Sequence, residues 1–564
     1  METPHVERSD VEWDYIVVGA GSAGCALTHE LVTDARKPRV LVLEAGGTDR
    51  SPYIRLQAGA FQACLNHDWG YRAQPDPTRH GLIERWWRGR VLGGCSSINS
   101  TIYVRGAARD FDRWGESFRG AHEHGWSAQE AMTILREIET SDQPGAARGH
   151  HGPLHVRTVK RPHPITAAFV ESARASGYPF NPDYNDVSQE GVAYAQLSQR
   201  GAWRCSAADA FLKPLVGKRN LELQHNALVE RIHIENGRAV AVSVVRNGRR
   251  QRLSARRIVL CAGTVNSPHL LMLSGIGDGQ ELRQHHIDVA LHLPGVGRNV
   301  RDHPLVKMIY ESRIPTHNLT GGLMQKLGFA AQLVAHGEGP IANVFESVAF
   351  LRSRPVEQAP DIQVHFVSIG YLAGPDCTYT LAPYPAVSVM INKSYPLSTS
   401  RIRLASANPA AAPLIESRLL QEEADVETLV QGMLAVRRIM QAQPIAELLV
   451  AERVPGPERA TLEALRDFTR HSAQIANHPV GSCRMGTGPD AVVGPDLRVH
   501  GIENLWVADA SIMPDMISGN TNAACMMIGK KLGKQLVAGA STQPQEDLPR
   551  SEPARTMTKA LGVR

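Results

Sequence analysis

The side chains best suited to chemistry lie near the C-terminus, where a histidine and two asparagines stand in glycine-punctuated segments. His478 precedes Pro479, which favours extended backbone, so its imidazole is expected on a loop. An imidazole titrates near pH 6.5 and can remove a hydroxyl proton at neutral pH. The chain has 23 histidines, however, and an arbitrary one is more often structural. Asn520 and Asn522 can hold an oxygen atom through their carboxamides, or can cap the helix expected to run to Val537.

The N-terminal region carries a dinucleotide-binding fingerprint. An apolar run, Tyr15–Val18, leads into a turn with glycines at 19, 21 and 24, after which the sequence reads as a helix. Gly19 permits the tight turn, Gly21 lets the backbone approach a pyrophosphate, and Gly24 lets strand and helix pack closely. A second apolar run ends in Glu44, whose carboxylate can bind ribose hydroxyls. Taken alone, this fingerprint is compatible with either FAD or NAD.

Bulk properties restrict the class of protein only mildly. With 564 residues the chain exceeds one compact core, so two domains are expected. Lys plus Arg outnumber Asp plus Glu by only 61 to 56, which gives no indication of nucleic acid binding. No apolar run is long enough to span a bilayer and the first ten residues lack a secretory core, so we expect a cytoplasmic enzyme without an integral membrane segment. The eight cysteines include no Cys-x-x-Cys pair, and no metal site is expected.

Further segments indicate how the chain is organised. Residues 89–106 are rich in Gly and Ser and include Asn99, which fits either a loop around a planar cofactor or a plain surface turn. Residues 258–277 read as a strand, a glycine turn and a helix, as if returning to the nucleotide sheet. Strand-like runs between 310 and 475 suggest a second, mixed domain, and residues 422–440 have the apolar spacing of a helix that covers its sheet.

With these motifs in view, the chain resembles the glucose-methanol-choline family of FAD-dependent oxidoreductases over almost its whole length. The resemblance rests on four ordered blocks: residues 19–24 with Glu44, 89–106, 263–277, and 478–486 followed by 507–529. The sequence at residues 93–100 and 526–529 is most similar to that of choline oxidases and related bacterial alcohol oxidases and dehydrogenases.

The resemblance implies an α/β (α+β) fold in which a Rossmann-like FAD-binding domain accompanies a substrate-binding domain with an antiparallel sheet. The implied FAD-binding domain is discontinuous, comprising residues 12–155, 215–310 and 476–540. The implied substrate-binding domain comprises residues 156–214 and 311–475, and residues 541–564 are expected to form a disordered tail.

The resemblance also implies which residues bind FAD. They are Gly19, Gly21, Gly24, Glu44, Ala45, Val91, Gly94, Asn99, Val229, Asp509, Ala510 and Asn520. Asn99 would lie beside the flavin ring, and Val229 would meet the adenine through its backbone. Some choline oxidases bond flavin covalently through a histidine where this chain has Ile98, so we expect noncovalent FAD.

By the same resemblance His478 is the catalytic base, Asn522 holds the substrate oxygen, and Asn520 lies nearer the flavin. Glu346 is a weaker candidate for contact with a cationic substrate, whereas the Asp302-His303-Pro304 turn is interpreted as structural.

The expected reaction is oxidation of a primary alcohol to an aldehyde, with hydride passing to flavin and electrons passing to O2 or a quinone. A cyanohydrin lyase of the same architecture is the alternative. An NAD-dependent dehydrogenase would leave the three later blocks unexplained.

Overall fold

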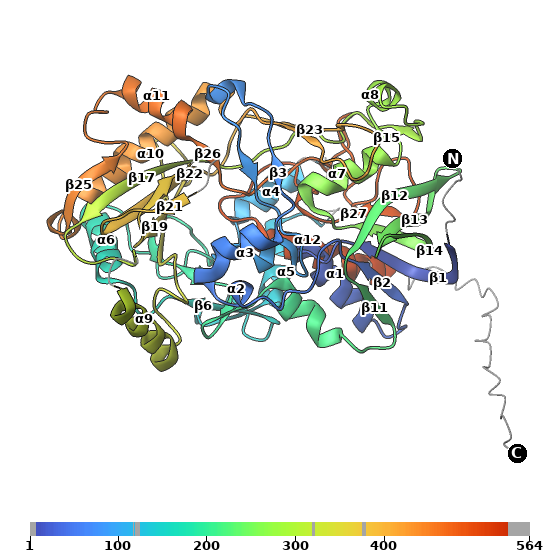
Figure 1. Ribbon diagram of the computed structural model, residues 1–564, viewed down its shortest axis with the longest axis horizontal. Coiled ribbons are helices and arrows are strands. Elements are labelled where there is room, and N and C mark those ends of the chain that lie inside the picture. Colours follow the sequence, from blue (N-terminus) through green and yellow to red (C-terminus); the bar gives the residue numbers. More distant parts are fainter. Residues whose placement is uncertain (1–6, 117, 119–124, 319–321, 375–378, 540–564) are drawn as a thin grey trace, which may run out of the picture.

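The computed structural model describes residues 7–116, 118, 125–318, 322–374 and 379–539. Two large sheets organise this part of the chain, one on the right and one on the left of Figure 1. One is a mixed sheet with a parallel core and the other is antiparallel, which confirms the predicted fold class. The predicted tail, 541–564, lies outside the described residues, as does Cys377.

The sheet on the right carries the nucleotide fingerprint. Its strand order is β11 (Leu221–Gln224), β2 (Val40–Leu43), β1 (Glu7–Val18), β14 (Arg249–Leu260), β13 (Arg238–Arg246) and β12 (Ala227–Glu235), and β27 (Leu505–Val507) pairs with β14. Strands β11, β2, β1, β14 and β27 run parallel. Every residue of β2 is buried, as expected for a parallel strand that is covered on both faces.

Two helices from opposite ends of the chain pack against each other beside this sheet. They are α1 (Ser22–Thr33) and α12 (Asn522–Gly539). A Cβ atom at Gly529 would lie only 2.1 Å from the carbonyl oxygen of Ala23, so glycine is required for this close approach. The predicted return of the chain at 258–277 is confirmed, because β14 leads into α7 (Gly263–Leu273).

The sheet on the left is antiparallel. Its order is β25 (Leu449–Val454), β17 (Pro304–Ser312), β22 (Ala386–Lys393), β19 (Ile362–Val367), β18 (Ser347–Leu351) and β7 (Gly191–Tyr194), and β26 (Gln474–Ile475) pairs with β17. The helix predicted at 422–440 is confirmed as α10 (Glu423–Gln441), which packs on β22 and β17. The domain boundary predicted at residue 310 falls inside β17.

Further α-helices surround the two sheets. They are α2 (Pro52–Arg55), α3 (Ala60–His67), α4 (Ala108–Glu116), α5 (Ala128–Ile138), α6 (Pro164–Ala175), α8 (Gly279–Gln284), α9 (Gly322–His336) and α11 (Leu462–Ser472).

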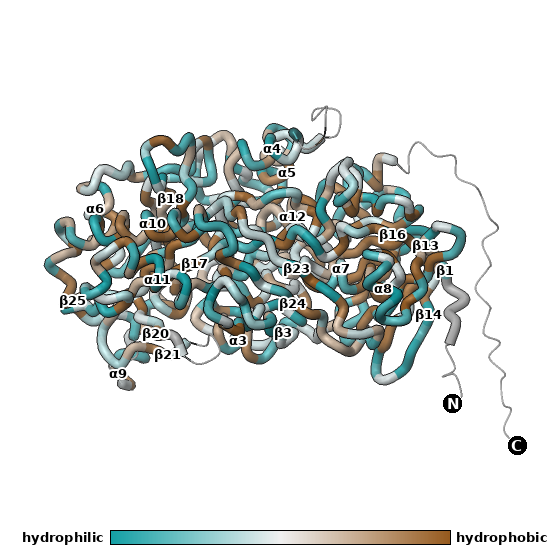
Figure 2. The backbone as a smooth tube through the Cα atoms, turned by 90° about the horizontal axis from the view of Figure 1, so that it is seen from above, coloured by the Kyte–Doolittle hydropathy of each residue, from teal (hydrophilic) through white to brown (hydrophobic). Residues whose placement is uncertain are grey.

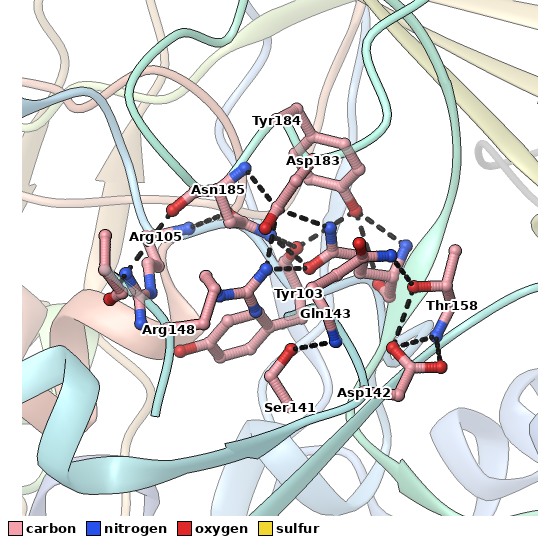
Figure 3. Close-up of polar contacts among 12 residues, drawn as sticks. Tyr103, Arg105, Ser141, Asp142, Gln143, Arg148, Thr158, Asp183, Tyr184 and Asn185 are labelled. Carbon is pink, nitrogen blue, oxygen red and sulfur yellow. Dashed lines mark hydrogen bonds and ion pairs between the residues drawn. The ribbon is translucent and has the colours of Figure 1, made fainter. Parts of the chain in front are cut away.

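A buried polar cluster holds the C-terminal end of the Gly- and Ser-rich segment, residues 103–105. Arg148 donates to Glu139 over 2.7 Å and to Asp183 over 2.6 Å. Asn185 accepts from the backbone N–H of Arg105 over 2.7 Å (Figure 3). Arg105 and Arg148 are both paired and hydrogen-bonded, so their burial is stabilised. Residues 103–105 are therefore held in place near Asn99.

Candidate active site

A cavity of about 1170 Å³ is lined by residues of both large sheets. Most residues expected to bind FAD line it: Gly19, Gly21, Glu44, Ala45, Gly94, Asn99, Val229, Asp509, Ala510 and Asn520. Gly24 and Val91 do not. Val91 is instead fully buried in a small apolar cluster with Ile54, Ala63 and Ile98, so its side chain supports the loop from behind.

The glycine turn after β1 has the shape that a pyrophosphate requires. A Cβ atom at Gly19 would lie 2.5 Å from the Cys261 carbonyl oxygen, and one at Gly24 would lie 2.0 Å from the Gly19 carbonyl oxygen. These two glycines therefore serve backbone packing. A Cβ atom at Gly21 would meet no heavy atom within 4 Å, because this residue faces the cavity at the N-terminus of α1. The space in front of Gly21, with the helix dipole behind it, fits a phosphate group.

Glu44 lies directly after β2 and is held by the same turn. Its Oε2 accepts from the backbone N–H of Ala20 over 2.9 Å, and its Oε1 accepts from that of Gly46 over 2.7 Å. Burial raises the pKa of Glu44 to about 7, although these two amides oppose that rise. The carboxyl group lines the cavity in a fixed orientation, which fits the predicted role in binding ribose hydroxyls.

The Gly- and Ser-rich loop packs directly on the glycine turn. The backbone N–H of Gly93 donates to the carbonyl of Ala20 over 2.8 Å, and a Cβ atom at Gly94 would lie 2.9 Å from the Cα of Gly21. Asn99 lines the cavity while its Oδ1 accepts from Arg204 over 2.7 Å. The loop therefore forms a cofactor cradle and is not a plain surface turn.

Asp509 organises the other side of the cradle. Its Oδ2 accepts from the backbone N–H of Gly263 over 2.9 Å and from the hydroxyl of Ser267 over 2.6 Å, and its Oδ1 accepts from the backbone N–H of Ser511. It therefore joins the end of β27 to the start of α7, and it places Ala510 at the cavity wall.

Three side chains meet at the expected catalytic position. The Nδ1 of His478 lies 3.0 Å from the Nδ1 of His303, and its Nε2 lies 3.0 Å from the Nδ2 of Asn520. Asn520 is oriented by Gln363, whose amide donates to the Asn520 Oδ1 over 3.2 Å. The backbone N–H of His478 donates to Asp302 over 3.0 Å.

The hydrogen bonds of His303 determine the tautomer of His478. The Nε2 of His303 lies 3.1 Å from the carbonyl oxygen of Ser394 and 3.0 Å from that of Ile517, so this nitrogen carries the proton. The Nδ1 of neutral His303 is then an acceptor, and the Nδ1 of His478 must donate to it. The remaining lone pair of neutral His478 is therefore on Nε2, where a hydroxyl proton could be taken.

Electrostatics keeps both imidazoles neutral. Burial lowers the pKa of His478 well below its ordinary 6.5, and nearby His303, His365 and Arg88 lower it further. Burial likewise lowers the pKa of His303 to about 4. A neutral base is thus present at and below neutral pH.

Asn520 and Asn522 both line the cavity but have different hydrogen-bond partners. Asn520 contacts His478, whereas the Oδ1 of Asn522 accepts from the hydroxyl of Ser22 over 2.7 Å. Asn522 is the first residue of α12 and Ser22 is the first residue of α1, so this bond joins two helix N-termini at the cofactor cradle. One residue of separation at a helix start turns the two side chains in different directions, which the sequence spacing did not reveal.

Glu346 does not line the cavity. Its Oε2 accepts from the hydroxyl of Thr166 over 2.6 Å and from the backbone N–H of His163 over 3.1 Å, at the N-terminus of α6. Its Oε1 lies 3.7 Å from the Nε2 of His317, which does line the cavity, so Glu346 stands behind the cavity wall in this structure. An acidic residue at the start of a helix stabilises its orphan N–H groups, which gives Glu346 a structural role.

Two histidines of the site are not apparent from the sequence. His303 contacts His478 although its Asp-His-Pro turn has the pattern of a structural feature. His365, on β19, lines the cavity, and its buried Nδ1 has no hydrogen-bond partner among the described residues. The only signal for His303 was its place between Asp302 and the first residue of a strand, and His365 had none beyond its residue type.

A glycine turn and a buried neutral imidazole that line one cavity fit a nucleotide-dependent oxidoreductase. The family model "GMC oxidoreductase" matches residues 13–305 with its N-terminal part and residues 396–529 with its C-terminal part. The chain therefore belongs to the GMC oxidoreductase family and is an FAD-dependent oxidoreductase that acts on alcohols.

Curated relatives match over nearly the whole chain. Human mitochondrial choline dehydrogenase is 36% identical over 97% of this chain and 93% of its own length. An alcohol dehydrogenase [acceptor] of Pseudomonas putida is 35% identical over 93% of this chain and 96% of its own length. Among solved structures, pyridoxine 4-oxidase from Mesorbium loti is 29% identical, with a TM-score of 0.84 over 93% of this chain and 99% of that one.

Proposed function

We propose that this enzyme oxidises a primary alcohol to an aldehyde with His478 as the base. The observation that carries the proposal is the hydrogen-bond chain from Ser394 and Ile517 through His303, which leaves the Nε2 of His478 unprotonated at the cavity. Removing the hydroxyl proton builds negative charge on the alcohol oxygen, and that charge helps expel hydride from the carbon.

The substrate hydroxyl would replace the Asn520 amide at the Nε2 of His478. The Asn520 amide, already oriented by Gln363, would then donate to the alcohol oxygen and stabilise its developing charge. His365 supports the same proposal, because it lines the cavity beside these groups. FAD, when bound, supplies the acceptor for the hydride. The proton stays on Nε2, while the Nδ1–H of His478 keeps its hydrogen bond to His303.

We propose that FAD is bound noncovalently. Ile98 is buried, with 4% of its surface exposed, and its side chain offers no nucleophile. Acid precipitation of the protein should release the flavin to the supernatant, and flavin that stays in the pellet would show a covalent bond.

The substrate side of the cavity supports an uncharged alcohol. Its wall includes the aromatic side chains of Phe345, Tyr371 and Tyr379, and the ammonium of Lys307 lies 3.7 Å from the Tyr379 ring centroid. The Glu346 carboxylate, which could balance a quaternary ammonium, does not line the cavity and accepts from Thr166. Although one relative is named choline dehydrogenase, we propose an apolar primary alcohol as the substrate of this chain.

Electrons are proposed to pass from the flavin to O2 or to a quinone. One relative, from Sinorhizobium fredii, is named an oxygen-dependent choline dehydrogenase, and another is named an alcohol dehydrogenase [acceptor], so both kinds of acceptor have a precedent. The relatives named here lend no support to the lyase alternative. Cytoplasmic location stays a prediction, which seven free thiols among the described residues support.

An anaerobic titration tests the reaction. Apolar primary alcohols should bleach the flavin absorbance of the purified protein, and choline should bleach it more slowly than its uncharged analogue 3,3-dimethylbutan-1-ol. Fast recolouring by air would identify O2 as the acceptor, whereas recolouring only by added quinone would identify a dehydrogenase. Flavin that no alcohol bleaches would contradict the proposed reaction.

A further inference from the structure

Helix α9 (Gly322–His336) has its hydrophobic face turned to the solvent. Leu323, Met324, Leu327 and Val334 are 71%, 78%, 53% and 87% exposed. At 3.6 residues per turn these four side chains and Ala331 fall within about 100° of the helix circumference, so they form one stripe. None of the helix's residues is buried.

The opposite face holds the helix to the protein and is partly polar. The ring of Phe329 packs edge-on against His317 with centroids 5.6 Å apart, and the Gln325 amide donates to the carbonyl of Asn318 over 3.4 Å. A surface helix of a water-soluble protein normally has the reverse pattern, with its apolar stripe against the core. The outward apolar stripe of α9 therefore indicates that something other than water covers this face of the helix.

Charge limits the kind of occupant. The helix sequence contains Lys326 and His336 and no Asp or Glu. Glu338, just beyond its end, is 8% exposed and paired with Arg157. Lys326 borders the stripe, whereas His336 lies on the opposite side of the helix. An apolar stripe with a lysine at its border and no acidic residue on the helix suits the interface of a bilayer that contains anionic lipid.

The place of α9 relative to the cavity explains what such an occupant would do. Lys326 and Phe329 line the cavity from α9. Phe61 and Leu381 also line it and are each 44% exposed, so the cavity reaches the surface beside the helix. Figures 1 and 2 both show α9 projecting at the edge of the molecule, where a flat surface can approach it. A second protein copy seated here would close the cavity, whereas a bilayer can deliver lipid-soluble compounds to it.

We propose that α9 is an interfacial helix that seats the cavity mouth on an anionic phospholipid bilayer. Among the described residues no helix is long and apolar enough to cross a membrane, so the contact is peripheral. The apolar alcohol and a lipid-soluble quinone, which belong to the proposed function, would then enter from the membrane. Attachment itself does not depend on that reaction.

The test measures vesicle binding of the full-length holoenzyme without turnover. Vesicles of phosphatidylcholine and phosphatidylglycerol in equal parts should co-sediment the protein. The double variant Met324→Glu/Val334→Glu should lower the bound fraction about tenfold or more, because charge is disfavoured in the apolar interface. The matched control Val187→Glu/Val356→Glu changes two valines that are 90% and 76% exposed and do not line the cavity, and it should bind like the parent. Unchanged flavin absorbance and melting temperature would show that both variants are folded.

Three results would overturn the proposal. The parent protein does not co-sediment with the vesicles, or both double variants bind equally, or sedimentation velocity shows a dimer that Met324→Glu/Val334→Glu dissociates. The last result would assign the stripe to a second copy of the chain. Because anaerobic bleaching by a water-soluble alcohol is measured without vesicles, failure of the proposed reaction can be told apart from failure of membrane binding.

Discussion

The Nδ1 atoms of His303 and His478 lie 3.0 Å apart, although the two residues are 175 positions apart in the chain. The pairing of β17 with β26 produces this contact, because Pro304 lies opposite Ile475. His303 directly precedes β17, and His478 follows shortly after β26. The contact fixes the tautomer of His478 and leaves its Nε2 as the acceptor at the cavity.

Replacing His478 with Ala should slow anaerobic flavin reduction by the alcohol about 10²–10⁴-fold, because the hydroxyl proton then has no base. Stopped-flow absorbance measures this rate. FAD content should be unchanged, and His151→Ala, at an exposed histidine outside the cavity, is the control. A rate within a few-fold of the parent would assign the base to another group.

His303 is a positioning residue, so its variants should differ by whether they keep an acceptor. His303→Ala leaves the Nδ1–H of His478 without its partner and should reduce the rate of flavin reduction. His303→Asn offers a carbonyl oxygen and should recover part of that rate. Equal rates in both variants would mean that His303 contributes only packing.

The acidic limb of kcat/KM should lie below pH 6.5. Burial, with the nearby histidines and Arg88, lowers the pKa of His478, so the neutral base persists as pH falls through 6.5 and is lost only at lower pH. The variant His303→Asn lacks one of these neighbours, so the pKa of the acidic limb should rise. A parent profile that already falls between pH 8 and 7 would contradict this assignment.

Asn520 and Asn522 should have separable effects. Asn520→Ala removes the amide at His478 and should slow flavin reduction about 10²-fold. Asn522→Ala removes the acceptor for Ser22 at the cofactor cradle and should instead increase FAD loss on dialysis, with a nearly normal reduction rate in the protein that retains FAD. The reverse pattern would restore the order expected from the sequence.

Glu346→Gln should change stability and leave substrate preference unaltered. The carboxylate accepts from Thr166 and from the start of α6, so its loss should lower the free energy of unfolding by about 1–3 kcal/mol. Thermal melting measures the change in stability. The ratio of KM values for choline and 3,3-dimethylbutan-1-ol measures substrate preference, and a large change in that ratio would place Glu346 at the substrate.

The nucleotide-binding motifs of this protein could be predicted from its sequence. The glycine turn, Glu44 and the helix expected to run to Val537 are local features, and local sterics and periodicity fix them before any tertiary contact forms. Most of the residues that line the cavity could therefore be named in advance, whereas Gly24 and Val91 pack away from it.

The orientation of the side chains around His478 could be learned only from the tertiary structure. Which nitrogen of His478 carries the proton depends on His303 and on two carbonyl groups, which come from separate strands and loops. Likewise, Asn520 rather than Asn522 meets the base, and Glu346 turns to α6, because of packing between elements far apart in the chain. Spacing along a sequence records which residues are near in the chain, whereas the direction of a side chain is set by the neighbours that the fold brings to it.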